Sequence, residues 1–185
     1  MKIDNSFSVP RPIADTWRIL LDIPTVVPCI PGVQLTEMVN AREFRLLGTV
    51  KLGPVQLTMH GDVEIASADE AAHVAVLAGK GRDNKGRGTA NATVTLALSP
   101  AGASQTQVHV TTELELAGAI AQYGRGTGLI QAVAGQIVTQ FAANLQAQLA
   151  SMPPPAEAKA LPLFQLLWRA FRAGLAKRLG RQPGG

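Results

Sequence analysis

The sequence predicts an α+β fold in which a curved antiparallel sheet wraps around one long C-terminal helix. Between residues 33 and 116, apolar residues recur at every second position, as in strands with one buried and one solvated face. From 120 to 150 they recur with the 3.6-residue period of a helix. Because each of these elements has one apolar face to bury, a sheet that grips the helix satisfies both patterns.

The N-terminal segment predicts a strand followed by two short helices. Alternating apolar and polar residues over 3–9 favour the strand. A helix over 12–21 follows, started by Pro12, with an apolar stripe on one side. The prolines from Pro24 to Pro31 then restrict the chain to a turn or a single helical turn.

Six antiparallel strands are predicted between residues 33 and 116. Turn-forming sequences separate them, for example Gly53-Pro54, Lys85-Gly86 and Pro100-Ala101-Gly102. The period of two also predicts which side chains face the helix, and none of these titrates. They are Val55, Leu57, Met59, Val63, Val94, Leu96 and Leu98.

An apolar cavity between sheet and helix is one expectation, and close packing without a void is the other. The helix opens with small residues, and aromatic residues make up only 4% of the chain, so large side chains to fill the gap are scarce. Apolar pockets of this kind bind small ligands. The residues expected to line the cavity are Trp17, Leu20, Phe44, Leu46, Leu57, Met59, Val94, Leu96, Tyr123, Ile130, Ala134, Ile137, Val138 and Phe141.

Three parts are predicted: a ligand-binding domain over 1–150, a proline-rich linker over 151–162, and a basic amphipathic helix over 163–185. The first 150 residues contain 11 basic and 12 acidic residues, whereas the last 35 contain six basic residues and one acidic residue. We expect this helix to bind an anionic membrane, although it could instead cover the domain's own apolar surface. The residues expected at the membrane are Phe164, Leu167, Trp168, Arg169, Phe171, Arg172, Leu175, Lys177 and Arg178.

No catalytic residue or metal site is predicted. His60, His73 and His109 occupy polar positions of alternating strands without metal-ligand spacing, which favours solvated side chains. Cys29 has no positive residue within the next ten positions to lower its pKa, so it is expected to be a small buried residue. The glycine-rich stretch 79–88 lacks the ending and the helix of a phosphate loop and predicts a hairpin tip, whose basic residues are candidates for membrane or partner contact.

The composition also bears on location and partners. A single cysteine excludes an intrachain disulfide, and no apolar run has the length of a signal peptide or a membrane span. We therefore expect a cytoplasmic protein that lies peripherally at the inner face of the cell membrane. Nucleic acid is not an expected partner, because the first 150 residues are slightly acidic and offer no stacking platform.

Several short motifs recur together in one known family. They are Pro10 followed by Trp17 and Asp22, then Cys29-Ile30-Pro31-Gly32, Leu52-Gly53-Pro54-Val55 with Gly61, Gly79-Lys80-Gly81 before Lys85-Gly86, and Tyr123-Gly124 with Leu129-Ile130. Over roughly 1–150 the chain thereby resembles the CoxG family of carbon monoxide dehydrogenase proteins, within the START-like (SRPBCC, helix-grip) superfamily.

The resemblance implies a non-enzymatic accessory protein that recruits a molybdenum-containing CO dehydrogenase, or a related hydroxylase, to the cytoplasmic membrane. It also implies a hydrophobic small molecule held between sheet and helix. Together with the predicted cavity and tail, this leads us to expect an isoprenoid quinone (menaquinone or ubiquinone) as a carried electron acceptor, with no covalently bound cofactor. The alternatives are a START-like enzyme such as an aromatic cyclase, and a lipid-binding module unrelated to CO dehydrogenase.

Overall fold

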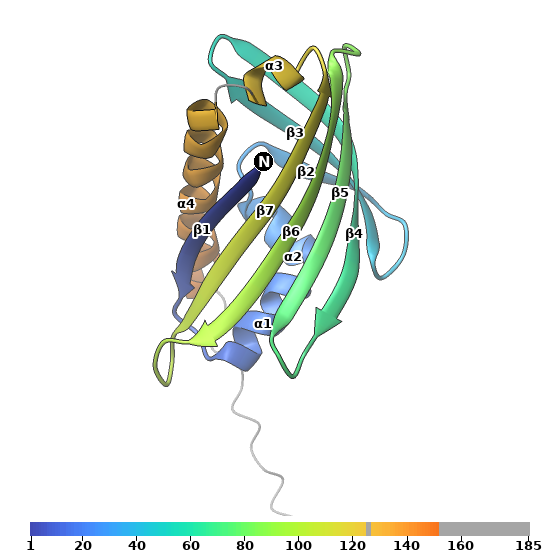
Figure 1. Ribbon diagram of the computed structural model, residues 1–185. Coiled ribbons are helices and arrows are strands. Elements are labelled where there is room, and N and C mark those ends of the chain that lie inside the picture. The colour runs from blue at the N-terminus through green and yellow to red at the C-terminus, as the bar shows by residue number, and fades with distance from the viewer. Residues whose placement is uncertain (125–126, 152–185) are drawn as a thin grey trace, which may run out of the picture. The chain divides into compact units, whose positions relative to one another are not determined.

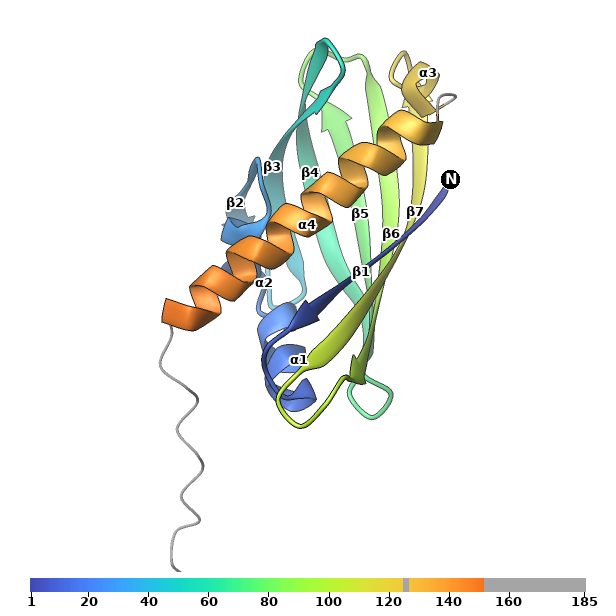
Figure 2. The same cartoon turned by 90° about the vertical axis from the view of Figure 1, so that its left-hand side faces the viewer.

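The computed structural model describes residues 1–124 and 127–151, and Met1–Ala150 forms one compact unit. The seven strands predicted from the alternation are confirmed. They are β1 (Lys2–Val9), β2 (Val33–Met38), β3 (Glu43–Leu52), β4 (Val55–Asp69), β5 (Val74–Asp83), β6 (Gly88–Pro100) and β7 (Thr106–Gly118). All pairings are antiparallel, and the strand order is β1-β7-β6-β5-β4-β3-β2. The sheet curves around the C-terminal helix α4 (Thr127–Ser151), as Figures 1 and 2 show.

The predicted short helices are also present, between β1 and β2. They are α1 (Ile13–Leu21), α2 (Ile23–Val26) and the 3-10 turn η1 (Val27–Cys29). Asp22 caps α2, because its Oδ1 accepts a hydrogen bond of 3.4 Å from the Thr25 backbone N–H, and its Oδ2 accepts a second one of 2.7 Å from the Thr25 hydroxyl. In the ribbon, α1 and α2 lie on the same side of the sheet as α4 (Figure 2).

The long helix begins later than its period suggested. A continuous helix over 120–150 was expected, whereas the structure has a separate single turn, α3 (Ala121–Gly124), and starts α4 at Thr127. The sequence between Gly124 and Gly128 alternates glycine with other residues, and glycine is a poor helix former. The apolar period alone therefore overestimated the length of the helix, placing its N-terminal end too early in the chain.

The C-terminal part of α4 is hydrogen-bonded to the first 30 residues of the chain, while its N-terminal part meets the sheet through apolar side chains. These bonds join polar groups of α4 to the segments on either side of α1. They run from Asn144 to the Cys29 carbonyl (2.9 Å), from Gln146 to the Ser8 carbonyl (3.0 Å), from Gln148 to the Thr25 carbonyl (3.2 Å), and from Arg11 to the Leu149 carbonyl (2.9 Å).

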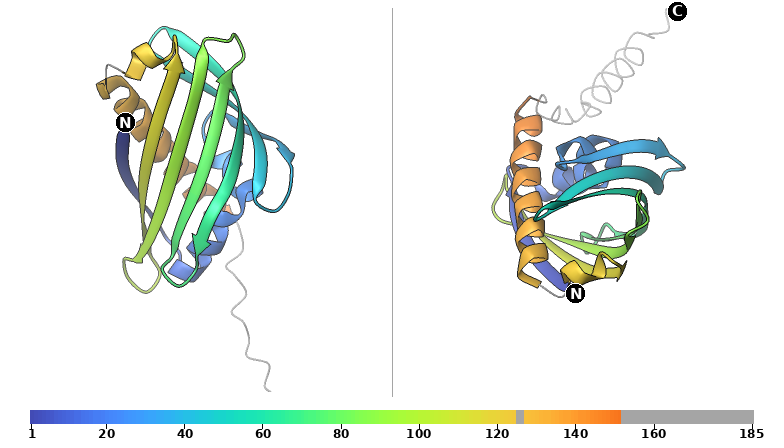
Figure 3. Two further views of the ribbon diagram at one scale, coloured as in Figure 1. Left: turned by 45° about the vertical axis from the view of Figure 1, so that its right-hand side comes forward. Right: turned by 90° about the horizontal axis from the view of Figure 1, so that it is seen from above.

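The buried apolar residues form two clusters, one larger than the other. The main cluster packs α1, α2 and the C-terminal part of α4 against the concave face of the sheet, with Leu145 fully buried. The second cluster lies where β3, β4 and α3 meet and contains Leu52, Leu57 and Ile120. Figure 3 shows the concave face with α4 along one side of it.

Candidate ligand-binding cavity

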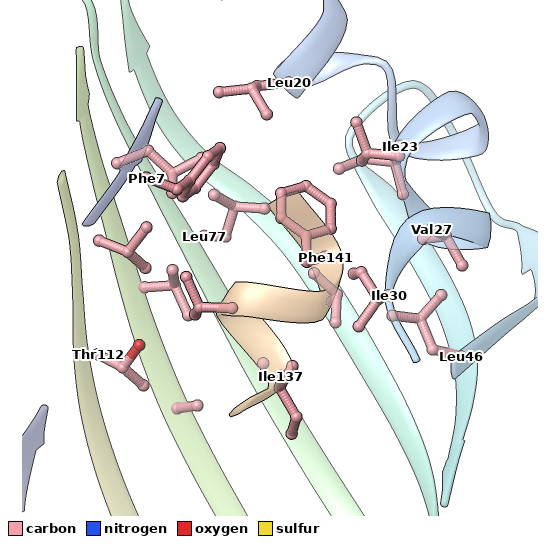
Figure 4. A pocket seen from close by; sticks show the side chains of 18 residues that line it. Phe7, Leu20, Ile23, Val27, Ile30, Leu46, Leu77, Thr112, Ile137 and Phe141 are labelled. Atoms are coloured by element: carbon pink, nitrogen blue, oxygen red, sulfur yellow. The ribbon is translucent and has the colours of Figure 1, made fainter. Parts of the chain in front are cut away.

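A cavity of about 350 Å³ lies between the concave face of the sheet, the segment from α1 to η1, and α4 (Figure 4). Its wall is almost entirely hydrocarbon. The lining residues are Phe7, Leu20, Ile23, Val26, Val27, Ile30, Leu46, Val63, Leu77, Gly79, Ala92, Val94, Leu96, Val110, Thr112, Ile137, Val138 and Phe141. No residue in this described lining titrates.

Two small residues on neighbouring strands leave the space open. Gly79 of β5 and Ala92 of β6 are direct cross-strand partners, and both line the cavity. A Cβ atom at Gly79 would lie 3.6 Å from Val63 Cγ2, which is ordinary van der Waals contact. Close backbone packing therefore does not require this glycine. Protein interiors are otherwise densely packed, so small residues at paired positions leave a void unless a neighbour fills it.

The opposite wall comes from α1 and the segment that follows it, and of its residues only Leu20 was predicted from the sequence. Leu20 belongs to α1, and four lining residues belong to the proline-confined stretch between α1 and β2: Ile23, Val26, Val27 and Ile30. Prolines occupy the first turns of both α2 and η1, which are short. Nearby, the rings of Phe7 and Phe141 meet edge to face with centroids 5.4 Å apart, and this contact joins β1 to α4 at the cavity wall.

Thr112 is the one described lining residue with a polar side chain, and Figure 4 shows its oxygen among the carbon atoms of its neighbours. It lies on β7, paired with Ile3 of β1 and Val94 of β6. Position 112 was not among the residues predicted from the sequence. The available signal was a break in the alternation of β7, where Val108, Val110, Leu114 and Leu116 are apolar and position 112 is threonine.

The structure places half of the predicted cavity residues at the cavity and half elsewhere. Those that line it are Leu20, Leu46, Val94, Leu96, Ile137, Val138 and Phe141. Those outside its lining are Trp17 and Phe44 in the main core, Leu57, Met59 and Tyr123 in the second cluster, and Ile130 and Ala134 on the first turns of α4. The periodicity carried no information on the position of a residue along its strand or helix, which decides whether it reaches the cavity.

The other candidate residues play no part in the cavity. His60 and His109 are exposed, as predicted. His73 is not a solvated strand residue: it lies in the turn before β5 with φ of 51°, half-buried, and meets the Trp17 ring edge to face at 5.6 Å. Within the described ranges, no group of His, Cys, Asp and Glu has the arrangement of a metal site.

Cys29 is a small buried residue, as predicted. Its Sγ donates a hydrogen bond of 2.9 Å to Gln148 Oε1 on α4, and burial raises the pKa of the thiol above its ordinary value. A thiol in this state is a poor nucleophile.

The glycine-rich stretch lies in the hairpin of β5 and β6, but only residues 84–87 form its tip, because 79–83 belong to β5 and Gly88 begins β6. The basic residues of the stretch have different environments. Arg87 donates to both carboxylate oxygens of Asp83, at 2.7 and 2.8 Å, and to the Gln56 carbonyl at 2.8 Å. The Arg87 hydrogen bond lowers the pKa of the buried Asp83 carboxyl far below its ordinary value, against the opposing effect of burial. Arg87 is therefore a structural residue, whereas Lys80, Arg82 and Lys85 are exposed.

Neither of the two described stretches contains a helix with the length and hydropathy that a bilayer span requires. The linker beyond residue 151 and the predicted membrane-binding residues, from Phe164 to Arg178, lie outside the described residues.

Comparison with known proteins identifies both family and fold. The family model for CoxG of carbon monoxide dehydrogenase matches residues 6–150. No curated protein sequence matches the chain. Among solved structures, a conserved protein from Geobacillus kaustophilus is similar, with a TM-score of 0.70, 20% identity, and coverage of 81% of this chain and 95% of that one.

Two further solved structures share the architecture at lower identity. The Zhui aromatase/cyclase from a Streptomyces species has a TM-score of 0.57 and 13% identity, covering 81% of this chain and 93% of its own. A START superfamily protein from Mycobacterium smegmatis has a TM-score of 0.53 and 14% identity, covering 82% and 99%. At these identities the similarities show the START-like fold and nothing finer.

Proposed function

This chain belongs to the CoxG family of carbon monoxide dehydrogenase proteins, and from that membership we propose that it is a non-enzymatic carrier that binds an isoprenoid quinone and presents it to a molybdenum-containing CO dehydrogenase or a related hydroxylase. The observation that carries the proposal is the cavity of about 350 Å³ with a single hydroxyl group in its described lining. Such a cavity binds an apolar, uncharged molecule, because a charged ligand would lose its hydration without gaining a partner.

The size of the cavity supports a ligand with a compact head and a chain that leaves the cavity. Small-molecule pockets typically measure about 300–1,000 Å³, so this one lies near the lower end. A quinone ring with the first part of its isoprenoid chain suits that volume, and the rest of the chain would extend outside. When bound, the quinone would supply a two-electron acceptor for the hydroxylase.

The chemistry of the lining favours a carrier over an enzyme. The Zhui aromatase/cyclase shares the fold, so catalysis in a cavity of this shape is the main alternative. General acid–base and nucleophilic catalysis require a titratable or activated side chain near the substrate. Here the described lining offers one hydroxyl and no base to activate it.

The proposal includes reversible attachment to the membrane through residues 163–185. A quinone is dissolved in lipid, whereas the hydroxylase is soluble, so a carrier must bind in turn to the membrane and to the hydroxylase. The basic and aromatic residues of this segment suit the anionic inner face of the cell membrane.

Extraction of the purified protein tests the carrier role. The protein would be purified without detergent from a quinone-producing host, extracted into organic solvent and examined by mass spectrometry. We expect a stoichiometric isoprenoid quinone in the wild-type extract and little in that of an Ala92→Leu variant, whose larger side chain enters the cavity. Equal, substoichiometric amounts of quinone in both extracts would contradict the proposal.

Electron transfer tests the partner. Quinone-loaded protein, mixed with the molybdenum hydroxylase and its substrate under anoxic conditions, should show reduction of the bound quinone in its ultraviolet spectrum. The Ala92→Leu variant, passed through the same loading procedure, is the control. A bound quinone that stays oxidised with the active hydroxylase would contradict delivery while leaving ligand binding intact.

A further inference from the structure

Thr112 differs from the other threonines of its strand in having no hydrogen-bond partner for its hydroxyl among the described residues. The fully buried Thr106, on the same face of β7, donates to the Arg11 carbonyl at 2.8 Å. Thr111, on the opposite face, donates to Asp4 Oδ1 at 2.7 Å. The half-buried Thr112 instead turns its side chain into the cavity.

The Thr112 hydroxyl stays accessible to solvent in the empty protein, because the residue is half-buried and no fully buried side-chain polar atom of the described residues lacks a hydrogen-bond partner. Its cross-strand neighbours, Ile3 and Val94, are aliphatic, and the other side chains of the described cavity wall are hydrocarbon. A ligand that displaces solvent from the cavity offers the hydroxyl a new partner only if it carries a hydrogen-bond acceptor. Valine has almost the same shape as threonine but could not make that bond, so the hydroxyl favours a ligand with an acceptor.

The surroundings of Thr112 define the chemistry of that ligand. A hydroxyl can donate to a carbonyl oxygen, and no cationic side chain lines the described cavity to balance a carboxylate. An anionic lipid would therefore bury an unpaired charge. A neutral ring that carries a carbonyl would place its oxygen against β7 and its apolar remainder against the α1–η1 wall.

We propose that Thr112 is a specificity-determining residue, which donates a hydrogen bond to a carbonyl oxygen of the ligand and so selects neutral carbonyl-bearing rings over plain hydrocarbons of the same size. This inference rests on the proposed function, because it assigns a ligand class and an orientation to the same cavity.

Two probes of nearly equal size test the inference: menadione, a methylated naphthoquinone, and methylnaphthalene, which lacks both carbonyls. Equilibrium dialysis of the full chain would measure the Kd for each. In the wild type, menadione should bind more tightly than methylnaphthalene. Thr112→Val should weaken menadione binding by about five- to tenfold, as expected for one hydrogen bond, and leave methylnaphthalene binding within about twofold.

Two control variants separate the hydroxyl from its position. Thr112→Ser keeps the donor and should retain most of the preference for menadione. Thr111→Val removes a hydroxyl from the neighbouring position on the outer face and should leave both affinities unchanged. Comparing the two probes in one variant distinguishes a lost hydrogen bond from a loss of packing, because poorer packing would weaken both.

The outcomes separate this inference from the function on which it rests. Unchanged menadione affinity in Thr112→Val, or equal weakening of both probes, would overturn the role of Thr112 while leaving a ligand-binding cavity. Failure of the wild type to bind either probe would overturn the ligand-binding function itself.

Discussion

Gly79 of β5 and Ala92 of β6 face each other as cross-strand partners at the wall of the cavity, and neither fills the space in front of it. An enlarged side chain here should therefore occupy the ligand's volume without disturbing the sheet. These two positions are therefore suitable for filling the cavity by substitution.

Ala92→Leu should reduce menadione affinity by about tenfold or more and leave the melting temperature unchanged or slightly higher, because the new side chain fills a void. Dialysis and thermal unfolding would measure the two effects. Ala78→Leu is the matched control, since Ala78 is the neighbour of Gly79 on the outer face of the same strand. Wild-type affinity in a folded Ala92→Leu protein would place the ligand outside this cavity.

The Asp83–Arg87 pair should make part of the stability depend on pH at the acidic end. The pKa of Asp83 is lowered in the folded protein, so its contribution is fully present above the unfolded value of about 3.9 and is lost as the pH falls below it. The urea midpoint of the wild type should therefore approach that of Asp83→Asn between about pH 5 and pH 2. A constant difference between the two proteins across this range would contradict the assignment.

Gly88 should tolerate no side chain, whereas the nearby Gly86 should tolerate alanine. A Cβ atom at Gly88 would overlap the backbone carbonyl of Ala117, which precedes its cross-strand partner Gly118, and approach Ile120 Cγ1 to 2.7 Å. At Gly86 the φ of 69° favours glycine, but the surrounding space is open.

We expect Gly88→Ala to destabilise the protein by about 3 kcal/mol or more and Gly86→Ala by about 1 kcal/mol. Urea denaturation would measure both. Equal costs at the two positions would show that backbone conformation, and not the contact with Ala117, is what restricts residue 88.

Truncation after Ser151 should leave the ligand-binding domain folded and abolish attachment to anionic membranes. The deletion keeps all of α4, including the residues that bond to the first 30 positions, and removes six basic residues and one acidic residue.

Flotation with vesicles containing phosphatidylserine would measure attachment, and vesicles of phosphatidylcholine alone would serve as the control. At roughly 1 kcal/mol for each basic residue near the surface, the full chain should bind the anionic vesicles at least about tenfold better than the truncated chain. Equal binding of both proteins would contradict the anchoring role of residues 163–185.

Much of the fold followed from the sequence because its signals are local. Period-two runs bounded by turn residues predicted every strand, and the prolines from Pro24 to Pro31 predicted the short helical turns. The start of α4 did not follow, because the apolar period continues through Ile120 and Tyr123 while the glycines between them and α4 oppose a helix.

The candidate site was harder to predict because it depends on register. Alternation assigned Leu57 and Val94 to the same inner face, yet only Val94 reaches the cavity, since Leu57 packs into the cluster with Ile120. The pairing of Gly79 with Ala92 brings together positions 13 residues apart, and no local pattern specifies it. Thr112 could be recognised in the sequence as a polar residue in an apolar series. Its proposed role in ligand binding, however, depends on the absence of a hydrogen-bond partner among the described residues, which only the structure shows.

Cys29 has a practical consequence for following the protein in solution. It is the only cysteine of the chain, its thiol is shielded by Gln148, and Asn144 bonds to its carbonyl. Alkylation of this thiol therefore requires the C-terminal part of α4 to detach from the segment beneath it. The alkylation rate under native conditions therefore reports how often the C-terminal part of α4 detaches. Comparing this rate with and without ligand would show whether ligand binding slows the detachment.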